Sequence, residues 1–136
     1  MKHILNFNQF VNESMLNEAE ALEKSIYYTL SDDTKTYDDF IILDMIPGQD
    51  GFDNMIKVLN KQKVVSCTVK SGSIDSGYKG YNVVVTLGSG NQIKLFIDKD
   101  DFSGTDLVKV VKSMTTKPDG KLLASAIQAA FEDEDY

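Results

Sequence analysis

The stretch YNVVVTLGSGNQIKLFI, residues 81–97, decides the fold that this sequence predicts. Apolar and polar residues alternate in both of its halves, which is the pattern of half-buried β-strands. The Gly-Ser-Gly-Asn segment at 88–91 separates the halves and has the composition of a hairpin turn. The stretch therefore predicts two antiparallel strands with one apolar face, made by Tyr81, Val83, Val85 and Leu87 and by Ile93, Leu95 and Ile97.

The rest of the chain extends this hairpin into an α+β fold. Short apolar runs predict further strands, and apolar spacings of three or four residues predict helices. Ser71 to Lys79 contains Gly72 and Gly77 and predicts a mobile loop. The order predicts a mostly antiparallel sheet of about four strands with helices packed on one side. The additional strands are expected at 40–43 and 64–69, and the helices at 7–30, 52–59, 105–114 and 121–131.

Length and charge limit the classes of partner. The 136 residues suffice for one domain, and the net charge is −7. Because the 14 basic residues are dispersed along the sequence, we expect no binding to nucleic acid. No apolar run approaches the roughly 20 residues that cross a bilayer, so we expect no membrane partner.

The residues of nucleophilic and metal chemistry are scarce. Cys67 is the single cysteine and lies in an apolar-rich segment, so we expect it to be a buried small hydrophobe. His3 is the single histidine and lies near a chain end. We therefore expect no catalytic residue, no cofactor and no metal, and a protein that is not an enzyme.

An acidic group follows the last predicted strand. Its members are Asp98, Asp100 and Asp101. Carboxylates in such an alternating arrangement can bind a hard cation. An EF-hand loop counted from Asp98 would need glycine at its sixth position and glutamate at its twelfth, where this chain has Ser103 and Lys109. We interpret the group as a charged turn before a helix.

The segment DFIILDMIPGQDGF, residues 39–52, resembles the phospho-acceptor segment of response-regulator receiver domains. The resemblance implies that Asp44 is the acceptor, and Lys117-Pro118 resembles that family's Lys-Pro pair. However, Pro47 follows Asp44 by three positions rather than four, and residues 4–8 lack the acidic pair that binds magnesium in the family. A degenerate receiver-like domain is therefore an alternative reading.

The segment MKHILNFNQFVNES, residues 1–14, resembles the leader that opens many small proteins of large tailed (T4-like) bacteriophages. The resemblance implies a targeting leader over 1–18, and the alternative is an ordinary N-terminal helix. Helical spacing would let Phe7, Phe10 and Val11 dock on one face. Leu16-Asn17-Glu18 fits the pattern cut by the prohead protease, with cleavage before Ala19. Residues 19–131 would then form the single domain, and 132–136 an acidic tail.

These patterns predict a non-enzymatic phage protein that binds a capsid or host protein. The leader favours a packaged or virion-associated protein. The net charge of −7 favours the alternative, an accessory protein that binds a host protein through its acidic surface. The expected location is the virion or the host cytoplasm, and the sequence leaves the oligomeric state open.

Overall fold

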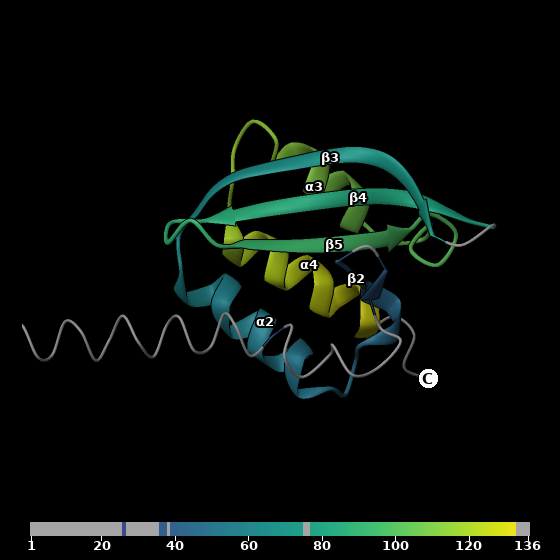
Figure 1. Ribbon diagram of the computed structural model, residues 1–136, viewed down its shortest axis with the longest axis horizontal. Coiled ribbons are helices and arrows are strands. Elements are labelled where there is room, and N and C mark those ends of the chain that lie inside the picture. The colour runs from purple at the N-terminus through teal and green to yellow at the C-terminus, as the bar shows by residue number, and fades with distance from the viewer. Residues whose placement is uncertain (1–25, 27–35, 38, 75–76, 133–136) are drawn as a thin grey trace, which may run out of the picture.

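The computed structural model describes residues 26, 36–37, 39–74 and 77–132, and it has an α+β fold (Figure 1). The predicted class is confirmed. The elements in chain order are β1 (Thr36–Tyr37), β2 (Phe40–Ile42), the 3-10 helix η1 (Leu43–Met45), α2 (Asp50–Lys61), β3 (Val64–Ile74), β4 (Tyr78–Leu87), β5 (Gln92–Asp98), α3 (Leu107–Ser113) and α4 (Gly120–Glu132).

The sheet is mixed rather than purely antiparallel. Its strand order is β1-β2-β5-β4-β3. The pairs β1·β2, β3·β4 and β4·β5 are antiparallel, whereas β2 and β5 are parallel. The parallel pair arises because α2 returns the chain along the sheet before β3 begins, so that β2, β3 and β5 run in one direction. The ends of β2 and β5 therefore lie side by side.

The predicted hairpin at residues 81–97 is confirmed. The amide of Leu87 donates a 2.8 Å hydrogen bond to the carbonyl of Asn91 and closes the turn. Gly90 has a φ of +96°, which a glycine adopts without steric cost. The alternating apolar residues of β4 and β5 face the core, as expected.

The three described helices cover that apolar face. Figure 1 shows α2 and α4 running beside each other along the long strands. α4 packs against both α2 and α3, and α3 packs against β3. Leu123, Ile127 and Ala130 supply the buried side of α4, at the spacing that the sequence predicted.

The predicted loop at 71–79 is wrong, because β3 extends to Ile74, β4 begins at Tyr78, and the two strands are paired there. We call this paired end of β3 and β4 the arm. Ser71 pairs with Tyr81, and Ser73 pairs with Lys79. The arm extends past the helices, so its side chains need not be apolar, while its backbone hydrogen bonds still form the ladder. A polar, glycine-containing sequence therefore forms a strand here.

Several expectations fall on residues that the structure does not describe. The predicted helix at 7–30 lies outside the described residues except for Ile26, which is helical and fully buried in the core. The leader at 1–18 and tail residues 133–136 also lie outside them. None of the helices in the described part is long and apolar enough to cross a membrane.

Candidate functional site

The arm carries a hollow where it passes the end of α3. Tyr81 on β4 and Val69 and Ser71 on β3 form its floor, and Lys112 and Thr115 at the end of α3 form one wall. Its volume is about 340 Å³, and Lys70 completes its rim. The ammonium nitrogen of Lys112 lies 4.8 Å from the centroid of the Tyr81 ring, within the range of a cation–π contact.

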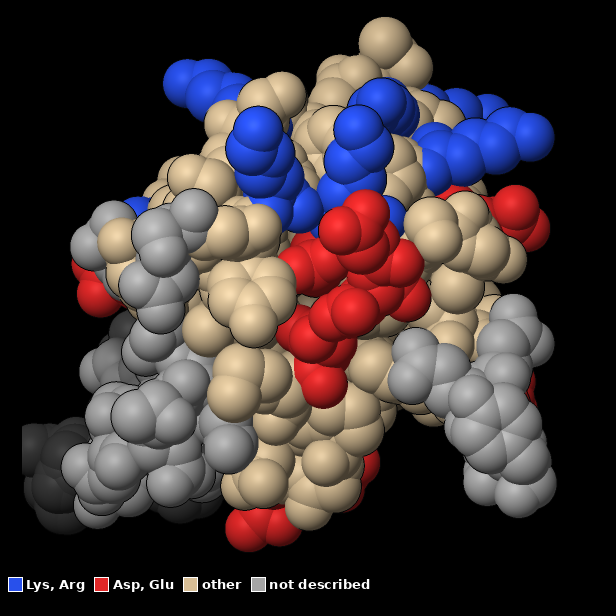
Figure 2. Space-filling view, turned by 90° about the vertical axis from the view of Figure 1, so that its right-hand side faces the viewer, with Lys and Arg blue, Asp and Glu red and all other residues tan. Residues whose placement is uncertain are grey.

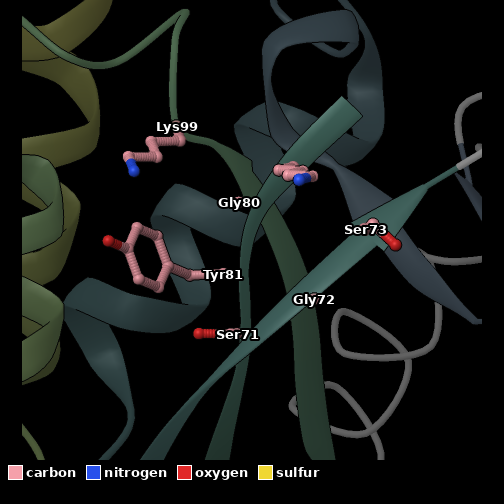
Figure 3. Close-up of a pocket in the computed structure, with 7 residues that line it drawn as sticks. Ser71, Gly72, Ser73, Gly80, Tyr81 and Lys99 are labelled. Atoms are coloured by element: carbon pink, nitrogen blue, oxygen red, sulfur yellow. The ribbon is translucent and has the colours of Figure 1, made fainter. Parts of the chain in front are cut away.

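A second hollow, of about 390 Å³, adjoins the first through Ser71 and Tyr81. Figure 3 shows the side chains of Ser71, Tyr81 and Lys99 pointing to the same side of the arm. The backbone amide of Lys99 donates a 3.0 Å hydrogen bond to the carbonyl of Lys79, which places the backbones of these two residues side by side. The residues that line this second hollow are Ser71, Gly72, Ser73, Lys79, Gly80, Tyr81 and Lys99.

The two hollows together form one surface, which we call the lysine groove. The residues that line it include Lys70, Lys79, Lys99 and Lys112, and no acidic residue is among the described residues that line it. Because Ser71 pairs with Tyr81 and Lys70 with Asn82, the side chain of Lys70 is on the opposite face of the sheet from Tyr81. The sequence did not reveal this groove, because its four lysines are spread over more than 40 positions. The available signal was topological: Lys79 and Lys99 each flank a strand of the predicted hairpin, at the ends remote from its turn.

Gly80 lets the strands of this region approach closely. A Cβ atom at position 80 would overlap the carbonyl oxygen of Ile97 and the ring of Phe96. Gly80 pairs with Asp98 at the end of β5. The close approach of the two strands therefore brings the lysine groove next to the acidic residues that follow β5.

An acidic cluster lies beside the lysine groove, at the ends of the parallel pair β2 and β5. It comprises Asp44, Asp98, Asp100 and Asp101. Figure 2 shows acidic side chains gathered on this end of the molecule, with lysine side chains along one edge of the cluster. The two charged surfaces therefore meet on the same end of the fold.

Asp98 organises the turn that carries this cluster. It is 5% exposed, and its Oδ1 accepts the backbone amides of Asp100 at 2.8 Å and Asp101 at 3.1 Å. Phe102 donates a further amide hydrogen bond to the Asp98 carbonyl. The charged turn before a helix, expected from the sequence, is what the structure shows.

Asp44 is the member of the acidic cluster whose carboxyl pKa is strongly shifted. Burial raises its pKa from 3.8 to about 7, with further increases from the neighbouring carboxyl group of Asp101 and from the negative charge of Asp98. Its buried Oδ1 has no hydrogen-bond partner. Within the described ranges, no three His, Cys, Asp or Glu side chains are placed to hold a metal ion.

The other residues singled out from the sequence fall into two groups. Phe7, Phe10, Val11 and the expected processing site Leu16, Glu18 and Ala19 lie outside the described residues. Cys67 is buried as expected, its Sγ lies 3.8 Å from the carbonyl of Val111, and burial raises the pKa of its thiol to about 11.

The surroundings of Asp44 differ from those that the receiver resemblance implies. That family has a doubly wound parallel sheet, whereas β2 and β5 are the one parallel pair in the described sheet. The carboxylates near Asp44 come from the turn after β5 rather than from a first strand.

Comparison of the chain with protein-family models, with curated proteins and with solved structures finds no match in any of the three.

Proposed function

We propose that this chain is a non-enzymatic bacteriophage protein that is packaged in the capsid or associated with the virion through a protein contact. The observation that carries the proposal is the N-terminal segment: the leader-like residues 1–14, followed by the cleavage pattern Leu16-Asn17-Glu18. The leader docks on a capsid or scaffold protein through the apolar side chains of Phe7, Phe10 and Val11.

The described domain has features that suit a binding role. A lysine groove and an acidic cluster meet at one end of the sheet, which gives this end a charge pattern that a partner can recognise. The thiol of Cys67 is held protonated by burial, so its environment is that of a packing residue rather than of a nucleophile.

The test of the leader is proteolysis of the full chain by the maturation protease of a T4-like phage. We expect a single early cut that leaves Ala19 as the new N-terminus, identified by mass spectrometry. The Glu18→Ala variant should resist this cut, whereas Glu13→Ala serves as a matched control that should be cut normally. Cleavage of Glu18→Ala at the same rate, or no cleavage of the parent chain, would overturn the processing step.

The docking step has its own test during infection. Tagged chain is supplied in infected cells, and purified particles are analysed for it. We expect the parent chain in the particles and the Phe10→Asp variant to be absent from them. Packaging of Phe10→Asp at the parent level would overturn the leader proposal. If the parent chain is present in cells but absent from particles, this result would favour the second candidate, which is described next.

The second candidate is an accessory protein that binds a basic host protein through the acidic cluster. The exposed carboxylates of Asp100 and Asp101 favour this candidate. Capture of a host protein should weaken as salt rises, and the Asp100→Asn/Asp101→Asn variant should lose it. The control Asp50→Asn/Asp106→Asn removes two charges elsewhere and should retain capture. Equal loss in both variants would contradict a role for this cluster.

The degenerate receiver-like reading makes a different prediction. It requires transfer of a phosphoryl group from acetyl phosphate to Asp44 in the presence of magnesium. A carboxyl group with a pKa of about 7 and an unpartnered Oδ1 is a poor site for an added dianionic group beside Asp98 and Asp101. We expect no labelled chain by mass spectrometry, and labelling abolished by Asp44→Asn would establish the receiver reading instead.

A further inference from the structure

The strand β3 forms one edge of the sheet. The strand order is β1-β2-β5-β4-β3, and among the described residues β3 forms its ladder with β4 alone. With 11 residues, Val64–Ile74, it is the longest strand of the described sheet. Alternate residues of such an edge strand direct their backbone N–H and C=O groups away from the sheet, where another strand can pair with them.

β3 lacks most of the features by which exposed edges avoid pairing with other chains. Protected edges are typically short, interrupted by proline or a bulge, or lined with charges. β3 contains no proline, and Lys70 is its single charged residue. Its one irregularity lies at its start, between Val64 and Ser66, and the register with β4 is continuous from Ser66 to Ile74. The regular part of the edge is therefore long enough to pair with an extended peptide.

Positive charge lies on both faces of this edge. Lys70 pairs with Asn82 in the ladder, so its exposed side chain points to the face of the sheet away from the helices. On the helix face, the exposed Lys112 at the end of α3 lies over the ring of Tyr81. β3 has no acidic residue, and the acidic cluster follows β5, two strands farther into the sheet. An edge with a lysine on each face attracts an acidic segment and repels a second copy of itself.

We infer that the outer edge of β3 binds an extended acidic segment of a partner protein, which pairs with it as a sixth strand of the sheet. Main-chain hydrogen bonds to β3 hold this segment, and its side chains project alternately to the two faces. Of two consecutive acidic residues in the segment, one therefore faces Lys70 and the next faces Lys112. A hollow of about 340 Å³ beside Val69, Ser71 and Lys112 gives room for the side chain on the helix face. This binding does not require residues 1–18 and is independent of the proposed packaging.

The test is fluorescence anisotropy of the labelled peptide acetyl-Thr-Val-Glu-Asp-Val-Thr-amide with the full chain at low ionic strength. The β-branched residues of the peptide favour an extended strand, and its two acidic residues probe the lysines. We expect saturable binding of one peptide per chain, weakened by added salt because salt screens the charges. The analogue with Gln-Asn in place of Glu-Asp should bind about tenfold more weakly, since it loses two charge-assisted contacts.

Methylation of alternate peptide amides separates strand pairing from attraction by charge alone. The amides of one alternating set donate to β3, and those of the other set point away from it. One of the two methylated peptides should therefore lose binding, and the other should keep it. Hydrogen exchange should show added protection in residues 66–74 of β3 and none in β2, near the opposite edge of the sheet. Equal binding of the two methylated peptides, or protection only outside β3, would overturn the strand addition.

The Lys70→Gln/Lys112→Gln variant should bind the acidic peptide about tenfold more weakly, with no change for the Gln-Asn analogue. The matched control, Lys61→Gln/Lys121→Gln, removes two exposed charges at the end of α2 and the start of α4 and should retain the parent affinity. Circular dichroism of each variant verifies the fold. Absence of saturable binding by the parent, or equal loss in the control variant, would overturn the inference. Dimerisation of the parent chain through residues 66–74, shown by sedimentation and hydrogen exchange, would assign the edge to a second copy and would overturn it as well.

Discussion

The carboxyl group of Asp44 lies beside that of Asp101, at the ends of β2 and β5. Two neighbouring carboxylates repel each other, so a proton on one of them is favoured. Burial of Asp44 is the largest influence on its pKa, and the neighbouring carboxyl groups of Asp101 and Asp98 act in the same direction. The parallel pairing of β2 with β5 therefore creates a group that titrates near pH 7.

This titration makes the free energy of unfolding depend on pH. The folded chain keeps a proton on Asp44 up to a pKa of about 7, whereas the unfolded chain releases it near 3.8. The folded state binds more protons in this window, so stability falls as pH rises from 4 to 7. We expect a loss on the order of 1–2 kcal/mol between pH 5 and pH 8, after allowing for solvent at this half-buried site.

The Asp44→Asn variant removes this dependence, because the amide is neutral at every pH. Urea denaturation should show the variant more stable than the parent at pH 8 and close to it at pH 5. The control is Asp106→Asn, whose exposed side chain makes no capping hydrogen bond at α3 and which should leave the slope unchanged. If the free energy of unfolding of the parent, relative to that of Asp44→Asn, rose from pH 5 to pH 8, this result would contradict a raised pKa of Asp44 in the folded chain.

Gly80→Ala should destabilise the sheet. The added Cβ overlaps the backbone carbonyl of Ile97, and a backbone group cannot move away as a flexible side chain can. We expect a loss of about 2–3 kcal/mol in the free energy of unfolding, measured by urea denaturation. Gly77→Ala is the matched control, because a Cβ there meets nothing within 4 Å, and its effect should stay within about 0.5 kcal/mol. Equal effects at both positions would show that the close approach at Gly80 is absent.

The arm around Gly80 shows what the sequence could and could not predict about the fold. β4 and β5 were predictable where one face meets helices, because burial imposes the alternation of Val83 and Val85 with polar residues. Beyond the helices no such burial acts, so Ser71 to Lys79 has a loop-like composition although its backbone is paired. The parallel pairing of β2 depends on a contact between distant segments and leaves no local pattern.

The candidate site was less predictable than the fold for the same reason. Asp44 and Asp98 each end a predicted strand, and the sequence supported a separate reading of each, one as a phospho-acceptor and one as part of a charged turn. Only the adjacency of β2 and β5 brings them into one cluster. The lysine groove likewise depends on the hydrogen bond between Lys99 and Lys79 and on the position of Lys112 over Tyr81.

Cys67 should be inert in the folded chain. Its thiol is buried against the carbonyl of Val111, and burial raises its pKa from 9.0 to about 11. The thiolate fraction at a given pH then falls about a hundredfold, and access is blocked as well. We expect a disulfide reagent to label the native chain at least about a hundredfold more slowly than the urea-unfolded chain.

A neighbouring position provides the control for this reactivity. Val65 lies on the same strand but is 47% exposed. In a Cys67→Ala background, Val65→Cys should react at nearly the rate of the unfolded chain. Rapid labelling of Cys67 in the native parent would contradict the buried position of β3 against α3.

Phe131 links α4 to two other parts of the core through its ring. It packs edge-to-face on Phe52 of α2, with centroids 5.5 Å apart, and on Phe102 of the turn after β5, with centroids 5.6 Å apart. Phe131→Ala should therefore lower the free energy of unfolding by about 2–4 kcal/mol. Leu122→Ala removes a 43% exposed side chain from the same helix and should change it by about 0.5 kcal/mol or less.

The ring–ring contact can be separated from simple loss of volume by a double-mutant cycle. Phe52→Leu, Phe131→Leu and the double variant keep apolar side chains but remove the edge-to-face geometry. Because the two rings contact each other directly, we expect a coupling free energy of about 0.5–1.5 kcal/mol from urea denaturation. A coupling near zero would mean that α2 and the end of α4 are not in contact through these rings. The same cycle with Phe102 and Phe131 tests whether α4 also holds the turn that carries Asp98 and Asp101.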